Sequence, residues 1–210
     1  ICRAIAVKLA EGHDVHETAD LEHVERVLGP HKHRPEPAER KLTPGVGTGL
    51  STSSGGGDIL FIEASRMPGK GQFVLTGNMR NVMQESATTA ISFVRSRARE
   101  LHLDPEWLRE IDLHVHVPKH GTPKDGPSAG ITIFTAVVSL LLDIPVRSDL
   151  AMTGEISLRG RVLPVGGIKR KLFGAHRAGI REVLIPMRNR RDLEDVPQEV
   201  LDEVKVTPVS

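Results

Sequence analysis

The chain has 210 residues, which is enough for one full domain with a small addition or for two small domains. Its formal net charge of +1 and its few aromatic residues (five Phe, one Trp and no Tyr) argue against a nucleic-acid or anionic-membrane surface. Cys2 is the single cysteine, so an internal disulfide and a four-thiolate zinc site are excluded. The longest apolar stretch, residues 131–142, is too short to span a bilayer. We therefore expect a soluble, mixed α/β chain of a reducing compartment.

Residues 1–28 show the spacing of two short helices. Apolar residues recur at helical intervals from Ile1 to Leu9, and a second pattern runs from Thr18 to a stop at Gly29. The chain begins without Met inside the first pattern, and prolines interrupt the charged segment that follows the second. We expect residues 1–43 to be the end of another, helical domain with a linker, and residues 44–210 to be the main domain.

The main domain carries both helical and strand patterns. Residues 45–57, GVGTGLSTSSGGG, predict a turn-rich, flexible stretch. Residues 112–117 alternate like a strand, with His114 and His116 on the polar face. Further strands are expected over residues 58–64, 73–76, 182–186 and 204–209, with a hairpin formed by 152–158 and 161–165. Helices are expected over residues 81–101, 128–142 and 168–178, with a short one after Asp104. The patterns predict an α/β (α+β) domain with mixed sheets and helices.

Residues 121–128, GTPKDGPS, come close to the phosphate-binding pattern G-x-x-x-x-G-K-[ST]. Pro127 replaces the lysine of that pattern and offers no N–H to a phosphate. As an active-site loop, the same residues would place Pro127 at the start of a helix and Ser128 in its first turn. The free N–H groups there could stabilise an oxyanion on a carbonyl that Ser128 attacks. From the loop alone, a serine that only caps the helix is the favoured interpretation.

A nucleophilic serine needs a base, and Lys171 has an unusual place for a lysine. It shares its helical face with the apolar residues Ile168 and Ala175. A desolvated lysine has a lowered pKa and can act as a neutral base near pH 7. The alternative is a lysine whose stem packs while its ammonium reaches solvent. For His114 and His116 we predict no metal, because no third ligand at suitable spacing completes a site.

Long motifs in the chain resemble the proteolytic domain of the ATP-dependent Lon proteases of bacteria and mitochondria. The longest are PKDGPSAG (123–130), MTGEISLRGRVLPVGGIKRKLFGAHRAGI (152–180) and VLIPMRNRRDLEDVP (183–197). Shorter ones agree as well, namely FIEA (61–64), MPGKG (67–71), VMQES (82–86) and DLHVHVP (112–118). The resemblance covers residues 45–209 and implies that family's compact α/β protease fold. Residues 1–43 resemble the last helices of its small helical ATPase subdomain.

The resemblance also implies a Ser–Lys catalytic dyad. Ser128 matches the nucleophile, Lys171 the general base, and Thr153 the threonine that orients the lysine. Residues around the family's active site are matched by His114, His116, Asp125 and Glu63. One departure is Ser51-Thr52-Ser53-Ser54, where the family often has Ala-Trp-Thr, and it touches no dyad residue.

For Asp125 we hypothesise an inactive state. In that state its carboxylate would reach Lys171 or the start of the helix that carries Ser128. An opposite charge beside the lysine would keep it protonated, which is wrong for a base.

By resemblance, the expected function is that of an ATP-dependent serine endopeptidase acting on unfolded or damaged proteins. The 210 residues contain no Walker motif, so no cofactor is expected in them, whereas the full-length protein is expected to use ATP and Mg²⁺. Expected partners are unfolded polypeptides and further copies in a hexameric ring, with no membrane and no indication of nucleic acid. The expected location is the cytoplasm, or alternatively the mitochondrial matrix. Two alternative functions are a catalytically silent assembly module of a Lon-like ring and a nucleotide-binding domain, which Pro127 argues against.

Overall fold

The computed structural model describes residues 2–13, 18, 20–29, 43–53, 55–118 and 125–210. The chain divides into two compact units, residues 1–35 and 36–210. The first contains α1 (Cys2–Ala10) and α2 (Leu21–Leu28), the two helices that the apolar spacing predicts. Asp20 caps α2, because its carboxylate accepts a hydrogen bond from the His23 N–H at 2.8 Å. Residues 30–42 of the expected linker lie outside the described residues, so the expected boundary after residue 43 stays a prediction.

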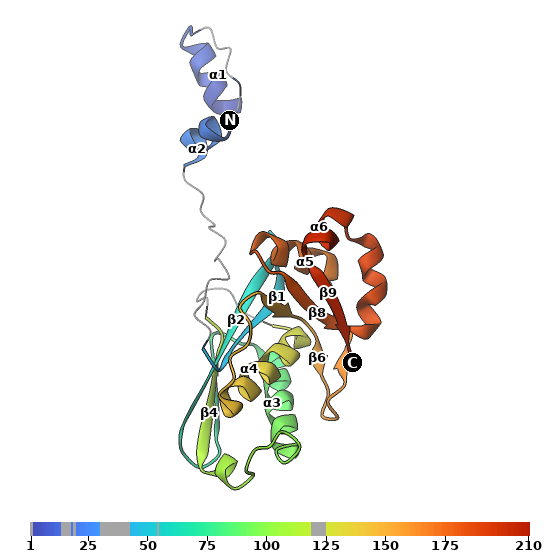
Figure 1. The fold of residues 1–210 in the computed structure, drawn as a ribbon. Coiled ribbons are helices and arrows are strands. Elements are labelled where there is room, and N and C mark those ends of the chain that lie inside the picture. Colours follow the sequence, from blue (N-terminus) through green and yellow to red (C-terminus); the bar gives the residue numbers. More distant parts are fainter. Residues whose placement is uncertain (1, 14–17, 19, 30–42, 54, 119–124) are drawn as a thin grey trace. The chain divides into compact units, whose positions relative to one another are not determined.

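Within the described residues, the second unit is built on a mixed sheet of seven strands (Figure 1). Their order across the sheet is β3-β4-β2-β1-β5-β8-β9. β1 and β2 form an antiparallel hairpin, and β2 then runs on to pair with β4. The strands β1, β5, β8 and β9 are parallel to one another. The bounds are β1 (Val46–Ser53), β2 (Gly56–Pro68), β3 (Phe73–Thr76), β4 (Ile111–His116), β5 (Leu150–Met152), β8 (Glu182–Pro186) and β9 (Lys205–Val209).

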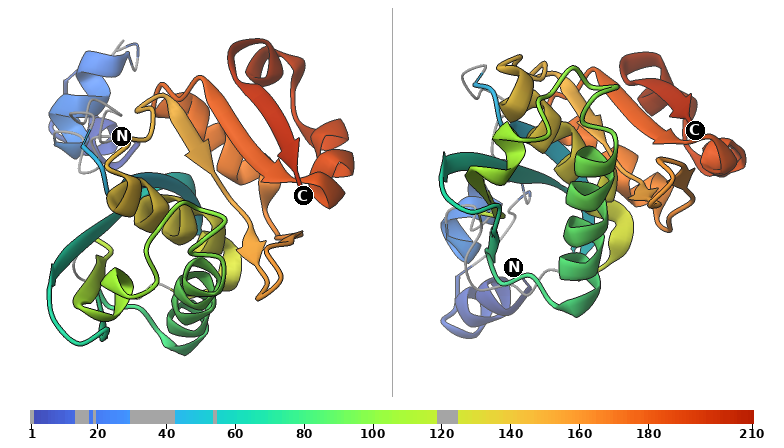
Figure 2. Two further views of the ribbon diagram at one scale, coloured as in Figure 1. Left: turned by 60° about the horizontal axis from the view of Figure 1, so that its bottom comes forward. Right: turned by 90° about the horizontal axis from the view of Figure 1, so that it is seen from below.

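Helices cover both faces of this sheet. The alternation along β2 divides the core, because Leu60 and Ile62 pack with α3 and α4, whereas Ile59 and Phe61 pack with α5. The helices α3 and α4 lie side by side (Figure 2). The remaining bounds are α3 (Asn81–Ser96), η1 (Trp107–Arg109), η2 (Pro127–Ala129), α4 (Gly130–Leu142), β6 (Glu155–Ile156), β7 (Val162–Leu163), α5 (Ile168–Arg177), η3 (Met187–Asp195) and α6 (Gln198–Glu203). The mixed α/β class expected from the sequence is confirmed.

The prediction of a turn-rich, flexible stretch over residues 45–57 is wrong. The described residues of this stretch form the hairpin of β1 with the start of β2, and residues 47–50 are buried. Glycine is needed there because α4 packs directly on β1. A Cβ on Gly49 would lie 2.9 Å from Thr132 Oγ1, and one on Gly47 would lie 3.1 Å from the Thr132 carbonyl oxygen. Ser54, the last residue of the departure from the family pattern, lies outside the described residues.

Other boundaries also differ from expectation. The hairpin expected over residues 152–165 is reduced to β6 and β7, because Met152 instead ends β5 in the main sheet. The helix expected to reach residue 101 ends at Ser96, and turns follow it. The short helix expected after Asp104 is the single 3₁₀ turn η1. No helix among the described residues is long and apolar enough to cross a membrane.

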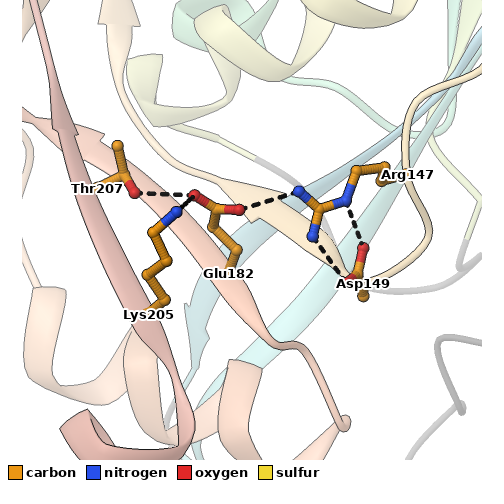
Figure 3. Close-up of polar contacts among 5 residues, drawn as sticks. All are labelled: Arg147, Asp149, Glu182, Lys205 and Thr207. Carbon is orange, nitrogen blue, oxygen red and sulfur yellow. Dashed lines mark hydrogen bonds and ion pairs between the residues drawn. The ribbon is translucent and has the colours of Figure 1, made fainter.

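An ion-pair network joins the starts of the parallel strands (Figure 3). The Arg147 guanidinium donates to Asp149 at 2.8 and 2.9 Å and to Glu182 at 3.0 Å. Glu182 also pairs with Lys205 at 2.9 Å and accepts a hydrogen bond from Thr207. Hydrogen bonds from Lys205 and Thr207 lower the pKa of Glu182. The network thus connects the loop before β5 with β8 and β9.

The helix α5 approaches the start of β2 more closely than side chains would permit. A Cβ on Gly174 would lie 2.5 Å from the Gly57 carbonyl carbon, and one on Gly57 would overlap the Arg170 carbonyl oxygen. Two glycines therefore let the helix backbone contact the strand backbone. This approach sets the position of Lys171, one residue beyond Arg170.

We expect Gly174→Ala to destabilise the domain. Overpacking against backbone costs up to about 3 kcal/mol, while alanine gains about 1 kcal/mol in helix propensity, which leaves a net loss of up to about 2 kcal/mol. Urea denaturation measures this loss. The matched control is Gly166→Ala, since a Cβ at Gly166 meets nothing within 4 Å. Equal stability of the two variants would contradict the close approach of α5.

Candidate active site

Ser128 lies half-buried in the 3₁₀ turn η2, which leads directly into α4. Pro127 begins this turn, as the sequence predicts, and residues 119–124 of the expected loop lie outside the described residues. The Ser128 carbonyl accepts hydrogen bonds from the Gly154 N–H at 2.9 Å and from Thr153 Oγ1 at 3.3 Å. The N–H groups of Ser128 and Ala129 stand in the first turn, where a helix supplies no acceptor of its own.

Lys171 is buried in α5, as its helical face predicts, with 3% of its surface exposed. Its Nζ donates to Thr153 Oγ1 at 2.8 Å. Thr153, which follows β5, is fully buried and in turn donates to the Ser128 carbonyl. A hydrogen-bonded chain therefore leads from Lys171 through Thr153 to the backbone of Ser128. It joins three segments that are far apart in the sequence.

Burial lowers the pKa of Lys171 from its ordinary value of 10.5 to about 8. The physical cause is desolvation, which penalises the ammonium more than the neutral amine. Near pH 8 about half of the Lys171 side chains are therefore neutral, and a neutral amine can accept a proton. Because only 3% of the Lys171 surface is exposed, the alternative of a lysine whose ammonium reaches solvent is excluded.

Asp125 lies at the start of α3. Its Oδ1 accepts hydrogen bonds from the Met83 N–H at 3.3 Å and from the Gly126 N–H at 3.0 Å. The residue that precedes α3, Arg80, makes no side-chain capping bond, so Asp125 supplies the negative charge that a helix N-terminus favours. The hypothesised contacts of Asp125 were with Lys171 or the helix of Ser128. Its hydrogen bonds in this structure go to α3 and to Gly126, the residue that precedes the Ser128 turn, and the inactive state stays a prediction.

His114 and His116 lie on one face of β4 and share a partner. Thr76 Oγ1, at the end of β3, is 2.8 Å from His114 Nε2 and 2.7 Å from His116 Nδ1. A hydroxyl has one proton, so it can donate to at most one of the two rings and accepts from the N–H of the other. Glu63 of β2 is opposite His116 in the strand register. Among the described residues no group of three side chains is arranged to hold a metal ion.

Two polar residues at the site were missed in the sequence. No sequence pattern indicates Thr76, because only the pairing of β3 with β4 brings it to the two histidines. Ser86 donates to the Pro127 carbonyl at 3.1 Å, and a sequence pattern does indicate this residue. It is a serine on the apolar face of α3, between Met83 and Ala90.

The lowered pKa of Lys171 predicts a pH dependence of stability. Between about 8 and 10.5 the unfolded chain binds more protons than the folded chain, so the free energy of unfolding rises with pH. The total rise is about 3 kcal/mol. Lys171→Met should be more stable than the parent near pH 7 and should lack this rise. Urea denaturation at several pH values measures it.

The matched control for this prediction is Lys169→Met, because Lys169 is an exposed lysine of the same helix. This variant should keep the rise in stability with pH. A rise that survives in Lys171→Met would contradict the assigned cause.

Comparison with known proteins gives a consistent result. The family described as "Lon protease (S16) C-terminal proteolytic domain" matches residues 18–210. The whole chain is 75% identical to 26% of "Lon protease 2" of Sorangium cellulosum. Similarly, 98% of the chain is 53% identical to 25% of "Lon protease 2" of Myxococcus xanthus, and 98% is 52% identical to 25% of "Lon protease" of Anaeromyxobacter dehalogenans. The chain thus spans about a quarter of the length of these relatives. It belongs to the family of Lon protease C-terminal proteolytic domains.

Proposed function

We propose that this chain hydrolyses peptide bonds, with Ser128 as nucleophile and Lys171 as general base. The observation that carries the proposal is the buried Lys171 Nζ, hydrogen-bonded to Thr153 and thereby connected to the backbone of Ser128. Covalent acyl transfer by a serine requires a base that is neutral at working pH, and Lys171 with its lowered pKa can supply one. Membership in a proteolytic-domain family supports the same reaction.

The reaction proceeds in two halves. Neutral Lys171 takes the proton of the Ser128 hydroxyl while Oγ attacks the carbonyl carbon of the peptide bond. N–H groups in the first turn stabilise the oxyanion of the tetrahedral intermediate. The C–N bond then breaks, the ammonium of Lys171 returns a proton to the leaving amine, and an acyl-enzyme remains. Water deprotonated by Lys171 attacks the ester and frees Ser128.

Thr153 orients the lysine by the direction of its hydrogen bonds. Its single hydroxyl proton is donated to the Ser128 carbonyl, so its oxygen can only accept from Lys171. The lone pair of the neutral amine therefore stays available for the proton of Ser128. Asp125, His114, His116 and Glu63 are proposed to shape the surroundings of the substrate, in agreement with the resemblance to the family.

The function of the full-length protein is part of the proposal. Relatives named Lon protease are about four times as long as this chain, which agrees with a proteolytic unit joined to other domains. We propose an ATP- and Mg²⁺-dependent, hexameric, cytoplasmic endopeptidase that acts on unfolded polypeptides. A catalytically silent assembly module is the alternative. The intact set of Ser128, Lys171 and Thr153 argues against it.

Ser128→Ala should abolish peptide cleavage and labelling by a serine-directed fluorophosphonate, at a stability cost of at most about 1 kcal/mol for a lost cap.

Lys171→Arg should be equally inactive, because a guanidinium does not deprotonate at working pH. The parent's activity should rise with pH through the lysine pKa of about 8. Ser96→Ala and Lys169→Arg, at exposed positions, are matched controls that should keep full activity. A parent labelled no more than Ser128→Ala would favour the silent module.

The 210-residue chain should cleave short or unfolded peptides slowly and leave stable folded proteins intact. A folded substrate must first be opened against roughly 5–15 kcal/mol, and a chain without a Walker lysine has no means of coupling ATP to that work. Incubation with a fluorogenic peptide and with a stably folded protein, each with and without ATP-Mg²⁺, measures this. ATP-dependent loss of the folded protein would refute the assignment of residues 1–43.

A further inference from the structure

The hydrogen bonds around Pro127 explain why the turn that carries Ser128 is 3₁₀ rather than α-helical. The Pro127 carbonyl accepts from the Gly130 N–H, as a 3₁₀ turn requires. The α-helical donor for the same carbonyl would be the Ile131 N–H, which donates to the Gly154 carbonyl at 3.1 Å instead. The second lone pair of the Pro127 carbonyl is occupied by the hydroxyl of Ser86.

Ser86 lies in a tightly packed contact between α3, α4 and β6. It is 7% exposed and stands on the face of α3 that meets the start of α4. A Cβ on Gly130 would lie 2.9 Å from Ser86 Oγ and 2.9 Å from the Ile156 N atom. The glycine thus allows α3, α4 and β6 to converge on the Ser128 turn. Nothing in the proposed reaction uses Ser86 directly.

Both peptide planes beside Ser128 are fixed by their carbonyl oxygens. In a trans peptide the N–H points opposite to the C=O, so an anchored carbonyl also sets the direction of its N–H. Ser86 anchors the carbonyl of the Pro127–Ser128 plane, while Thr153 and Gly154 anchor that of the next plane. The directions of the Ser128 and Ala129 N–H groups follow from these bonds.

We propose that Ser86 is a positioning residue for acyl transfer. Its hydroxyl holds the Pro127 carbonyl and thereby aims the Ser128 N–H at the oxyanion. This inference rests on the proposed function, because it needs Ser128 to form a tetrahedral intermediate. Ser86 contacts neither substrate nor reacting atoms, so it acts on the chemical step and leaves substrate binding unchanged.

Ser86→Ala should lower kcat for a fluorogenic peptide about tenfold, the value of one net hydrogen bond, with KM unchanged. The affinity for a peptide boronate should fall by the same factor. In that adduct Ser128 Oγ adds to boron and its proton passes to Lys171, so the adduct mimics the tetrahedral intermediate. Ser86→Cys fills the site with a slightly larger thiol that is a much weaker donor, and it should behave like Ser86→Ala even if the alanine variant folds poorly.

Two comparisons make the result specific. Thr88→Ala removes another hydroxyl of α3, one that donates to the Gln84 carbonyl, and it should leave kcat and boronate affinity unchanged. Ser86→Thr keeps the hydroxyl and should recover most of kcat. A kcat within about twofold of the parent in both Ser86→Ala and Ser86→Cys, or an equal loss in Thr88→Ala, would overturn the assignment of Ser86.

The parent and Ser128→Ala separate this inference from the proposed function. If the parent forms the boronate adduct, Ser128→Ala does not, and Ser86→Ala matches the parent, then only the role of Ser86 is wrong. If the parent itself forms no adduct, the proposed reaction is overturned and the role of Ser86 with it.

Discussion

Burial of Lys171 is the constraint on which the arrangement of the site depends. An amine removed from water loses the solvation that favours its charged form, and its one described hydrogen-bond partner, Thr153, is neutral. The same desolvation that lowers the pKa of Lys171 therefore costs stability, fully below about pH 8 and less as the pH rises toward 10.5. The destabilised residue is the one for which we propose a role as neutral general base. Perturbed groups of this kind are typical of functional sites.

Close backbone approach is what makes that burial possible. Glycines stand where α5 meets β2, where α4 meets β1, and where α4 meets both α3 and β6. At each contact a Cβ would overlap a neighbouring atom, so larger residues would push the helices away from the sheet. The hydroxyls of Ser86 and Thr153 then bridge the remaining short gaps to carbonyl oxygens of the Ser128 turn. Rigid positioning of the turn thus comes from small residues rather than from large side chains.

Charged side chains have two different roles in the domain, one at the strand starts and one at the start of α3. The exposed network of Arg147, Asp149, Glu182 and Lys205 ties β8 and β9 together at the starts of the strands. Because Arg147, Asp149 and Lys205 are exposed to solvent, each ion pair contributes modestly to stability, and the network serves mainly to link the segments. Asp125, in contrast, places a single carboxylate at the start of α3, three residues from Ser128. The loop that carries the proposed nucleophile is therefore coupled to the helix that also provides Ser86.

The sequence by itself determined most of the periodic elements and the family of the chain. Apolar spacing predicted α3 and α5 and placed Lys171 on a buried face, because helical periodicity depends only on neighbours along the chain. The motifs around Ser128 and Lys171 likewise identified the family. The sequence pattern led to a wrong prediction for β1, since its glycines allow contact with α4 rather than form a turn. It also did not indicate that Thr76 contacts the two histidines or that Ser86 contacts the Pro127 carbonyl. Only the tertiary structure decided these points, because each depends on atoms brought together from distant segments, a relation that no local pattern encodes.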